Sequence, residues 1–184
     1  GNGRDSLTIN NAGQTNNVGN NIYSSAGYFY GNIYNSSNRT DFDHTEKLIV
    51  TMGDGSDSLS LDGSSLASSL AVLSVDAAGG SDSLNAGLGA VAGAITLTDT
   101  SLTATRLSLT HFETFNITFG AFNDSVDITN ATNAQLRMGD GNDTVKITNA
   151  VGYQTVDGGN GLDTLVINNA AQTTGRTNTL NSSS

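Results

Sequence analysis

Six segments of this sequence share an arrangement of residues that could bind a cation or cap a turn. Each begins with Asp, followed by Ser or Thr and then by Leu or Val, at Asp5, Asp57, Asp82, Asp124, Asp143 and Asp163. Glycine-rich turns precede most of these residues. Glycine lets the backbone turn its carbonyl groups inward, and a carboxylate then adds to a set of hard oxygen ligands. Because Ca²⁺ takes about six to eight oxygens, two adjacent turns would have to share one ion.

The balance of acidic residues supports a specific role for these aspartates. The chain contains 15 Asp and two Glu, Glu46 and Glu113, whereas an acidic surface that only solvates the protein would use both types. A short carboxylate is favoured where it must bond local backbone or hold a cation in a tight turn. The alternative is that Asp and Asn cap these turns through side-chain hydrogen bonds without any metal.

The repeated turns and strands predict how the elements are arranged. Four copies continue into the similar endings INNA (9–12 and 167–170) and ITNA (128–131 and 147–150). One turn and strand cannot bury an apolar face alone, so the copies must stack, which predicts a parallel β-solenoid of the β-roll or β-helix type. The last spacings, 143−124 = 19 and 163−143 = 20, predict coils of about 19–20 residues. In the longer gap after Asp82, the segment 100–104 is predicted to be a missing copy, with Thr100 in place of Asp.

Apolar columns appear when the copies are aligned on their Asp residues. Seven residues upstream lie Val50, Val75, Ile117, Leu136 and Val156, and two residues downstream lie Leu7, Leu59, Leu84, Val126, Val145 and Leu165. Polar residues alternate with them, as in half-buried strands, and helical periodicity is absent. We therefore expect an all-β fold with almost no helix. A β-sandwich is the alternative, although a sandwich does not need columns in register.

The domain organisation follows from where this pattern holds. We predict a single solenoid domain over 1–170, an irregular aromatic insertion at about 13–46, and a polar tail or linker over 171–184. The insertion contains Tyr23, Tyr28, Phe29, Tyr30, Tyr34 and Phe42. It would be either a contact patch for a glycan or another chain, or a cover for the flank of the solenoid.

Composition excludes several classes of partner and site. The formal charge is −10, and the seven Lys and Arg do not cluster, which argues against nucleic acid. The absence of Cys removes disulfides and thiolate metal sites. No apolar run is long enough to suggest membrane insertion.

The glycine-rich turns carry a family resemblance. The segment 158–166, GGNGLDTLV, matches the nonapeptide G-G-x-G-x-D-x-U-x, while 138–146 and 52–60 each miss only the first Gly, and 1–8 matches as far as it goes. This pattern resembles the RTX, or haemolysin-type, calcium-binding repeat of secreted bacterial proteins, over roughly a third of the chain.

The resemblance implies Ca²⁺ held between successive turns. The best site would lie between turns 139–143 and 158–163, and a second candidate pairs Asp57 with Asp82. The ligands at the first site would be Asp143, Asp163 and the carbonyls of Gly139, Gly141, Gly159 and Gly161. RTX proteins carry a nonapeptide at both turns of each coil, whereas here the second turn carries Asn11, Asn130, Asn149 or Asn169. Calcium is therefore expected at one edge only, with stacked Asn at the other.

The sequence shows no catalytic constellation. The two histidines, His44 and His111, lack a metal-ligand spacing such as HExxH, and no G-x-S-x-G elbow is present. The segment 111–115 alternates like a strand, which predicts that His111 and Glu113 point outward together. We therefore expect no enzymatic activity.

The combined pattern favours a structural module of a secreted or cell-surface protein. It would be part of a fibre, a surface layer or an adhesin stalk, rigidified by calcium and joined head to tail to another copy or to adjacent repeats of a longer chain. A truncated solitary solenoid is the alternative to such joining. A glycan- or receptor-binding module, or a polysaccharide-degrading enzyme on a β-helix scaffold, is the alternative function.

Overall fold

The computed structural model describes residues 5–25, 28–35, 38–63, 72–89, 94–98, 100–104 and 106–171. Within these residues the chain forms 17 β-strands and no helix, which confirms the expected all-β class. The strands belong to two sheets of nine and eight strands, here called sheet A and sheet B. Except for its first residue, the predicted tail at 171–184 lies outside the described residues.

Sheet A contains nine strands, and most of its neighbours are parallel. Their order across the sheet is β1 (Ser6–Asn10), β5 (Lys47–Thr51), β7 (Val72–Asp76), β11 (Leu107–Thr110), β10 (Ser101–Ala104), β9 (Ala94–Leu97), β13 (Ser125–Thr129), β15 (Thr144–Thr148) and β17 (Thr164–Asn168). Strand β10 runs antiparallel to both of its neighbours.

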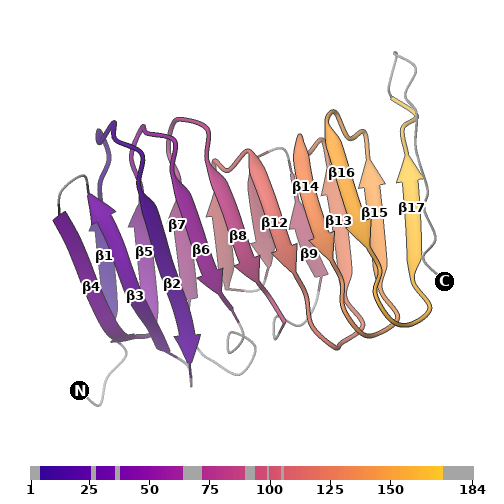
Figure 1. Ribbon diagram of the computed structural model, residues 1–184, viewed down its shortest axis with the longest axis horizontal. Coiled ribbons are helices and arrows are strands. Elements are labelled where there is room, and N and C mark those ends of the chain that lie inside the picture. The colour runs from indigo at the N-terminus through magenta and orange to yellow at the C-terminus, as the bar shows by residue number, and fades with distance from the viewer. Residues whose placement is uncertain are drawn as a thin grey trace.

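Sheet B contains eight strands and is parallel from β16 to β2. Their order is β16 (Tyr153–Asp157), β14 (Asn133–Arg137), β12 (Thr114–Thr118), β8 (Ser83–Gly87), β6 (Ser58–Asp62), β2 (Gly19–Ser25), β3 (Tyr28–Asn35) and β4 (Asn38–Thr45). In both sheets the strands stand side by side along the long axis, with β4 near one end of the described strands and β17 at the other (Figure 1).

The core lies between the two sheets and consists of side chains that alternate along each strand. Ile117, Leu136 and Val156 are neighbours in register in sheet B, and the first two are fully buried. Val126, Val145 and Leu165 are neighbours in register in sheet A. Both predicted columns are therefore confirmed as neighbours, although Leu165 on the last strand is exposed.

The column predicted upstream of the Asp residues is nevertheless split between the sheets. Val50 and Val75 pair with each other in sheet A, whereas Ile117 and Leu136 pair in sheet B. The cause is the antiparallel meander β9–β10–β11, which places three strands in sheet A before a short connection enters β12 in sheet B. The repeated motif is therefore shifted by half a circuit of the chain around the two sheets. Before the meander its turn leads from sheet A to sheet B, and after the meander it leads from sheet B to sheet A.

This shift corrects the expectation that the Gly/Asp turns occupy one edge. Turns 52–57 and 77–82 lead from sheet A to sheet B, whereas turns 119–124, 138–143 and 158–163 lead from sheet B to sheet A. Because these strands are parallel within each sheet, the two groups of turns lie at opposite edges.

The segment 100–104 is not the missing copy that its sequence suggested. It forms β10, the central strand of the meander, and it runs against the direction of the other strands in sheet A. Its apolar alternation is the same in either direction, so the pattern alone could not reveal the reversal.

The tyrosine-rich segment forms part of sheet B. Strand β2 pairs in parallel with β6, while β3 and β4 extend the sheet as an antiparallel meander. Phe29, Ile33 and Phe42 are buried, whereas Tyr23, Tyr28 and Tyr30 are exposed on the other face. The phenylalanines therefore cover the core and the tyrosines face outward.

Candidate functional site

An acidic residue stands immediately before eight of the described strands. These residues are Asp5, Glu46, Asp57, Asp82, Glu113, Asp124, Asp143 and Asp163, before β1, β5, β6, β8, β12, β13, β15 and β17. At this place a carboxylate can accept a hydrogen bond from the backbone N–H of the neighbouring turn, and such charge-assisted bonds are stronger than neutral ones.

Three of these residues form what we call the first carboxylate ladder: Asp57, Asp82 and Glu113. The Asp57 N–H donates to Asp82 Oδ1 at 2.7 Å, and the Asp82 N–H donates to Glu113 Oε2 at 2.7 Å. Asp57 itself accepts from the Val18 N–H at 2.9 Å. Each carboxylate thus bonds the turn that precedes it along the stack.

The second carboxylate ladder consists of Asp124, Asp143 and Asp163 at the opposite edge. The Asp124 N–H donates to Asp143 Oδ1 at 2.8 Å, and the Asp143 N–H donates to Asp163 Oδ1 at 3.0 Å. A shorter pair repeats the arrangement near the N-terminal end, where the Asp5 N–H donates to Glu46 Oε2 at 2.8 Å.

Asparagine side chains next to the second ladder bond in the opposite sense. The Asn142 N–H donates to Asn123 Oδ1, and the Leu162 N–H donates to Asn142 Oδ1, each at 2.8 Å. Asn160 Nδ2 also donates to Asp140 Oδ1 at 2.7 Å. Adjacent turns are therefore joined in both directions, by carboxylates that accept from the preceding turn and amides that accept from the following one.

Glycine is required in the last turn because a neighbouring backbone approaches it closely. Gly159 and Gly161 have φ values of 83° and 136°, in the range that L side chains rarely adopt. A Cβ atom at Gly159 would overlap the carbonyl oxygen of Gly139, and one at Gly161 would overlap that of Gly141. The carbonyls of one turn thus lie directly against the next turn.

Several ladder carboxylates are buried with an oxygen unused. Asp82 and Asp143 are each 1% exposed. The Oδ2 atoms of Asp82, Asp124 and Asp143 have no hydrogen-bond donor among the described residues. A buried carboxylate in this state favours a cation at the unused oxygen.

Burial changes the acidity of three ladder residues. It raises the pKa of Asp82 to about 6, opposed by the bond from the Asp57 N–H and assisted by the charges of Asp57 and Glu113. Burial, assisted by the charge of Asp143, also raises the pKa of Asp124. The pKa of Asp57 is raised by burial as well, although hydrogen bonds from Val18 and Gly53 oppose the change.

The structure brings the predicted calcium ligands into adjacent turns. Asp143 and Asp163 are linked directly, as are Asp57 and Asp82. The Gly139 carbonyl accepts from the Asn160 N–H at 2.8 Å, so it already has one partner. In the described part of the chain, no three His, Cys, Asp or Glu side chains converge in a metal-binding group. A cation here would therefore need backbone carbonyls in addition to carboxylates.

Sequence reasoning missed the place of both glutamates. Glu46 and Glu113 occupy the same position before a strand as the repeat aspartates, and Glu113 ends the first ladder. The prediction that His111 and Glu113 point outward together from a strand was wrong. Both lie in the connection between β11 and β12, where His111 has a φ of 60° and its ring contacts Asp76 instead. The signal available was an acidic residue followed by Thr-Phe-Asn-Ile, the same order as in the Asp copies.

Comparisons with protein-family models, with curated proteins and with solved structures found no match for this chain. Among the described residues, no helix has the length and apolar character needed to cross a membrane.

Proposed function

We propose that this chain is a parallel β-solenoid, with coils of about 19–20 residues, that serves as a structural module of a secreted or cell-surface protein. The carboxylate ladders carry this proposal, because they join successive turns along the same axis as the strand pairing. The module would belong to a fibre, a surface layer or an adhesin stalk. It would act without catalysis.

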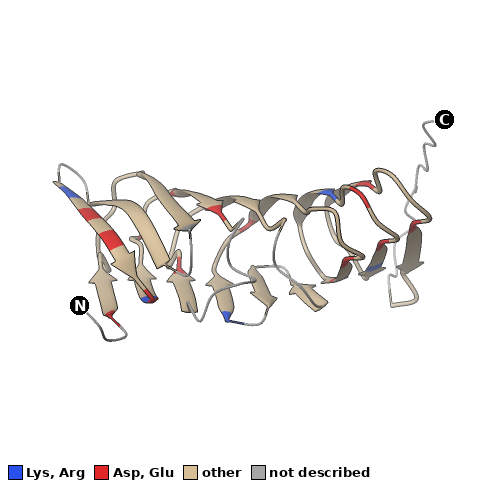
Figure 2. Cartoon of the chain, turned by 90° about the horizontal axis from the view of Figure 1, so that it is seen from below, with Lys and Arg blue, Asp and Glu red and all other residues tan. Residues whose placement is uncertain are grey.

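A module of this kind resists deformation along its length. Outside the two antiparallel meanders, the strand pairings are parallel and join one copy to the next, and apolar side chains in register fill the space between the sheets. Acidic residues occur along the length of the molecule, several of them at its turns (Figure 2). Each added copy therefore lengthens the module and repeats the same contacts.

We further propose that Ca²⁺ stabilises the second ladder, in keeping with the resemblance to RTX repeats. The support is the combination of glycines that expose carbonyls to the next turn and the unused Oδ2 of Asp143. Ca²⁺ prefers such neutral and charged oxygens together, and it would offset the burial of the carboxylate. The pair Asp57 and Asp82 is the second candidate.

Immunoelectron microscopy of native cells, with an antibody raised against this chain, tests the proposed role. We expect label on an extracellular fibre or layer, and a loss of order in that material when calcium is chelated. Label confined to the cytoplasm would contradict both the location and the role.

One observation favours a second function, the binding of a neutral polysaccharide. On the outer face of β2, β3 and β4, the rings of Tyr23 and Tyr30 stack with centroids 5.4 Å apart, and Tyr28 lies against His44. Exposed aromatic rings offer apolar area at a low cost in side-chain entropy. They can pack against the apolar face of a sugar ring.

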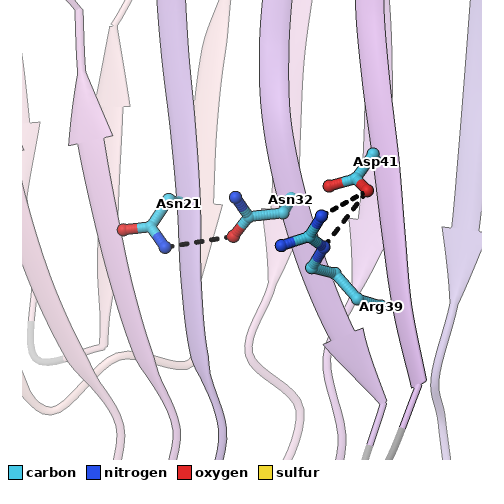
Figure 3. Close-up of polar contacts among 4 residues, drawn as sticks. All are labelled: Asn21, Asn32, Arg39 and Asp41. Carbon is cyan, nitrogen blue, oxygen red and sulfur yellow. Dashed lines mark hydrogen bonds and ion pairs between the residues drawn. The ribbon is translucent and has the colours of Figure 1, made fainter.

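Polar groups with spare bonding capacity lie on the same face, because Asn21 and Asn32 are each two residues along their strands from Tyr23 and Tyr30. Asn21 Nδ2 donates to Asn32 Oδ1 at 3.1 Å, while Arg39 forms two bonds with Asp41 Oδ2 (Figure 3). Each amide still has a donor or acceptor for a hydroxyl group. Because Arg39 and Asp41 neutralise each other, this face suits an uncharged ligand better than an acidic one.

Depletion of the protein by insoluble cellulose, with dextran as a soluble probe, tests this second function. Tyr23→Ala and Tyr30→Ala should each weaken retention. Tyr153→Ala changes an 88% exposed tyrosine away from this face and is the matched control. Equal retention of all three variants would exclude the face as a glycan site.

A further inference from the structure

Within the part of the chain that the structure describes, strand β17 forms an apolar edge of sheet A. Strand β17 pairs with β15 and has no partner on its other side among the described residues. Leu165, Val166 and Ile167 are 40%, 44% and 36% exposed, although Leu165 and Ile167 continue columns that are buried in β15. An edge of this kind readily accepts another strand.

The other end of sheet A carries nearly the same sequence. Residues 1–12, GNGRDSLTINNA, and residues 159–170, GNGLDTLVINNA, are identical at nine of the twelve positions. Strand β1 likewise pairs on one side, with β5, and it runs in the same direction as β17. The sequence that forms one edge is therefore also suited to pack against the other.

We propose that β17 pairs in parallel with β1 of a second copy of this chain. By analogy with the register of β15 and β17, Thr164 would lie beside Ser6 and Ile167 beside Ile9. The Asp163 N–H would donate to the Asp5 carboxylate of the second copy, as the Asp143 N–H donates to Asp163. This inference rests on the proposed solenoid and identifies the surface through which copies join.

The contact propagates because the two edges are different. Each copy offers one β17 and one β1, so a joined pair still has one edge of each kind. The end strand of sheet B, β4, is less suited to strand addition because it carries Arg39, Asp41 and Asp43, and charges on an edge strand oppose such pairing. Sheet A therefore specifies the joint and its direction.

Two substitutions block the two edges separately. Ile167→Lys places a charge in the apolar column of β17, and Val166→Lys is its control, since Val166 lies on the face of Lys146. Thr8→Pro blocks β1. The Asn11 N–H bonds the Thr51 carbonyl, so by alternation the Thr8 N–H points away from β5 and its loss removes no bond to that strand.

Sedimentation velocity over a wide concentration range, at physiological ionic strength with Ca²⁺, tests the joint. We expect wild type and Val166→Lys to form a series of growing species, and Ile167→Lys and Thr8→Pro each to remain monomeric. Mixing the two blocked variants should give one-to-one dimers, because each retains one functional edge. Circular dichroism checks that the variants are folded.

Two results would overturn this joint. A wild-type protein that stays monomeric would exclude it, and so would assembly that Ile167→Lys and Val166→Lys affect equally. The solenoid proposal is judged separately by small-angle X-ray scattering of the monomer. Nine strands about 4.8 Å apart predict a rod of roughly 40 Å, and a spherical particle would contradict the solenoid itself.

Discussion

The two carboxylate ladders make the same backbone bonds in different surroundings. In the first ladder, Asp57 uses both carboxylate oxygens on backbone N–H groups, and in the turns 52–57 and 77–82 Gly80 is the one glycine with positive φ. In the second ladder, the turns 138–143 and 158–163 contain four such glycines, Gly139, Gly141, Gly159 and Gly161. The acidic residue is thus kept while the surrounding backbone changes.

This difference separates two uses of one carboxylate. As a hydrogen-bond acceptor, it needs only a neighbouring N–H, which both ladders provide. As a cation ligand, it also needs carbonyl oxygens turned toward the same space, which requires glycines like those beside the second ladder. We therefore expect calcium to stabilise mainly the second ladder, whereas the first ladder should respond to protons through Asp82.

The largest effect is expected from a side chain added to the last Gly/Asp turn. Gly161→Ala should destabilise the fold by about 1–3 kcal/mol from backbone strain and by about 1–3 kcal/mol more from overlap with the Gly141 carbonyl. The control is Gly87→Ala, where an added Cβ meets no atom within 4 Å. Chemical denaturation measures the free energy of unfolding of both variants. Similar losses of stability in Gly161→Ala and Gly87→Ala would contradict the close approach between the two turns.

Removal of a buried ladder carboxylate should have the next largest effect. Asp143→Ala leaves the Asp124 N–H without its acceptor and should cost about 1–3 kcal/mol in the free energy of unfolding. Asp82→Ala should cost less at pH 7, since it also removes a buried charge whose pKa is raised. Denaturation of both variants in chelator compares their free energies of unfolding without calcium. A larger loss of stability in Asp82→Ala than in Asp143→Ala would contradict this prediction.

A smaller effect is expected from pH. The pKa of Asp82 is about 6 in the fold and lower in the unfolded chain, so the folded state binds the proton more tightly. Stability should therefore rise as the pH falls from 7 through 6 toward the ordinary Asp value of about 3.9. Melting curves across this range in chelator test the trend. Asp82→Asn should reduce this slope, and an unchanged slope in Asp82→Asn would exclude Asp82 as a source of the trend.

The sequence predicted the local elements well and their placement less well. The alternation around Ile117, Leu136 and Val156 identified neighbours correctly, because burial on one face of a strand imposes a period of two. The half-circuit shift after β8 could not be predicted, because the reversed strand β10 shows the same alternation as a parallel one.

The sequence likewise identified most of the ladder carboxylates but not how they are placed relative to one another. The Asp copies were found by their repeated neighbours, whereas Glu113 was hidden by a longer side chain and a shorter preceding turn. The pairing of carboxylates with backbone of the preceding turn depends on stacking. Stacking is a property of the assembled copies and not of any one segment.

Differential scanning calorimetry with and without calcium tests the central claim, that the second ladder is a calcium-stabilised joint between turns. At a calcium concentration about 100 times Kd, binding adds about 2.7 kcal/mol and should raise the melting temperature of wild type by roughly 5–10 °C. The shift should disappear in Asp163→Ala and persist in Asp82→Asn. Identical transitions of the wild-type protein with calcium and with chelator would contradict the account.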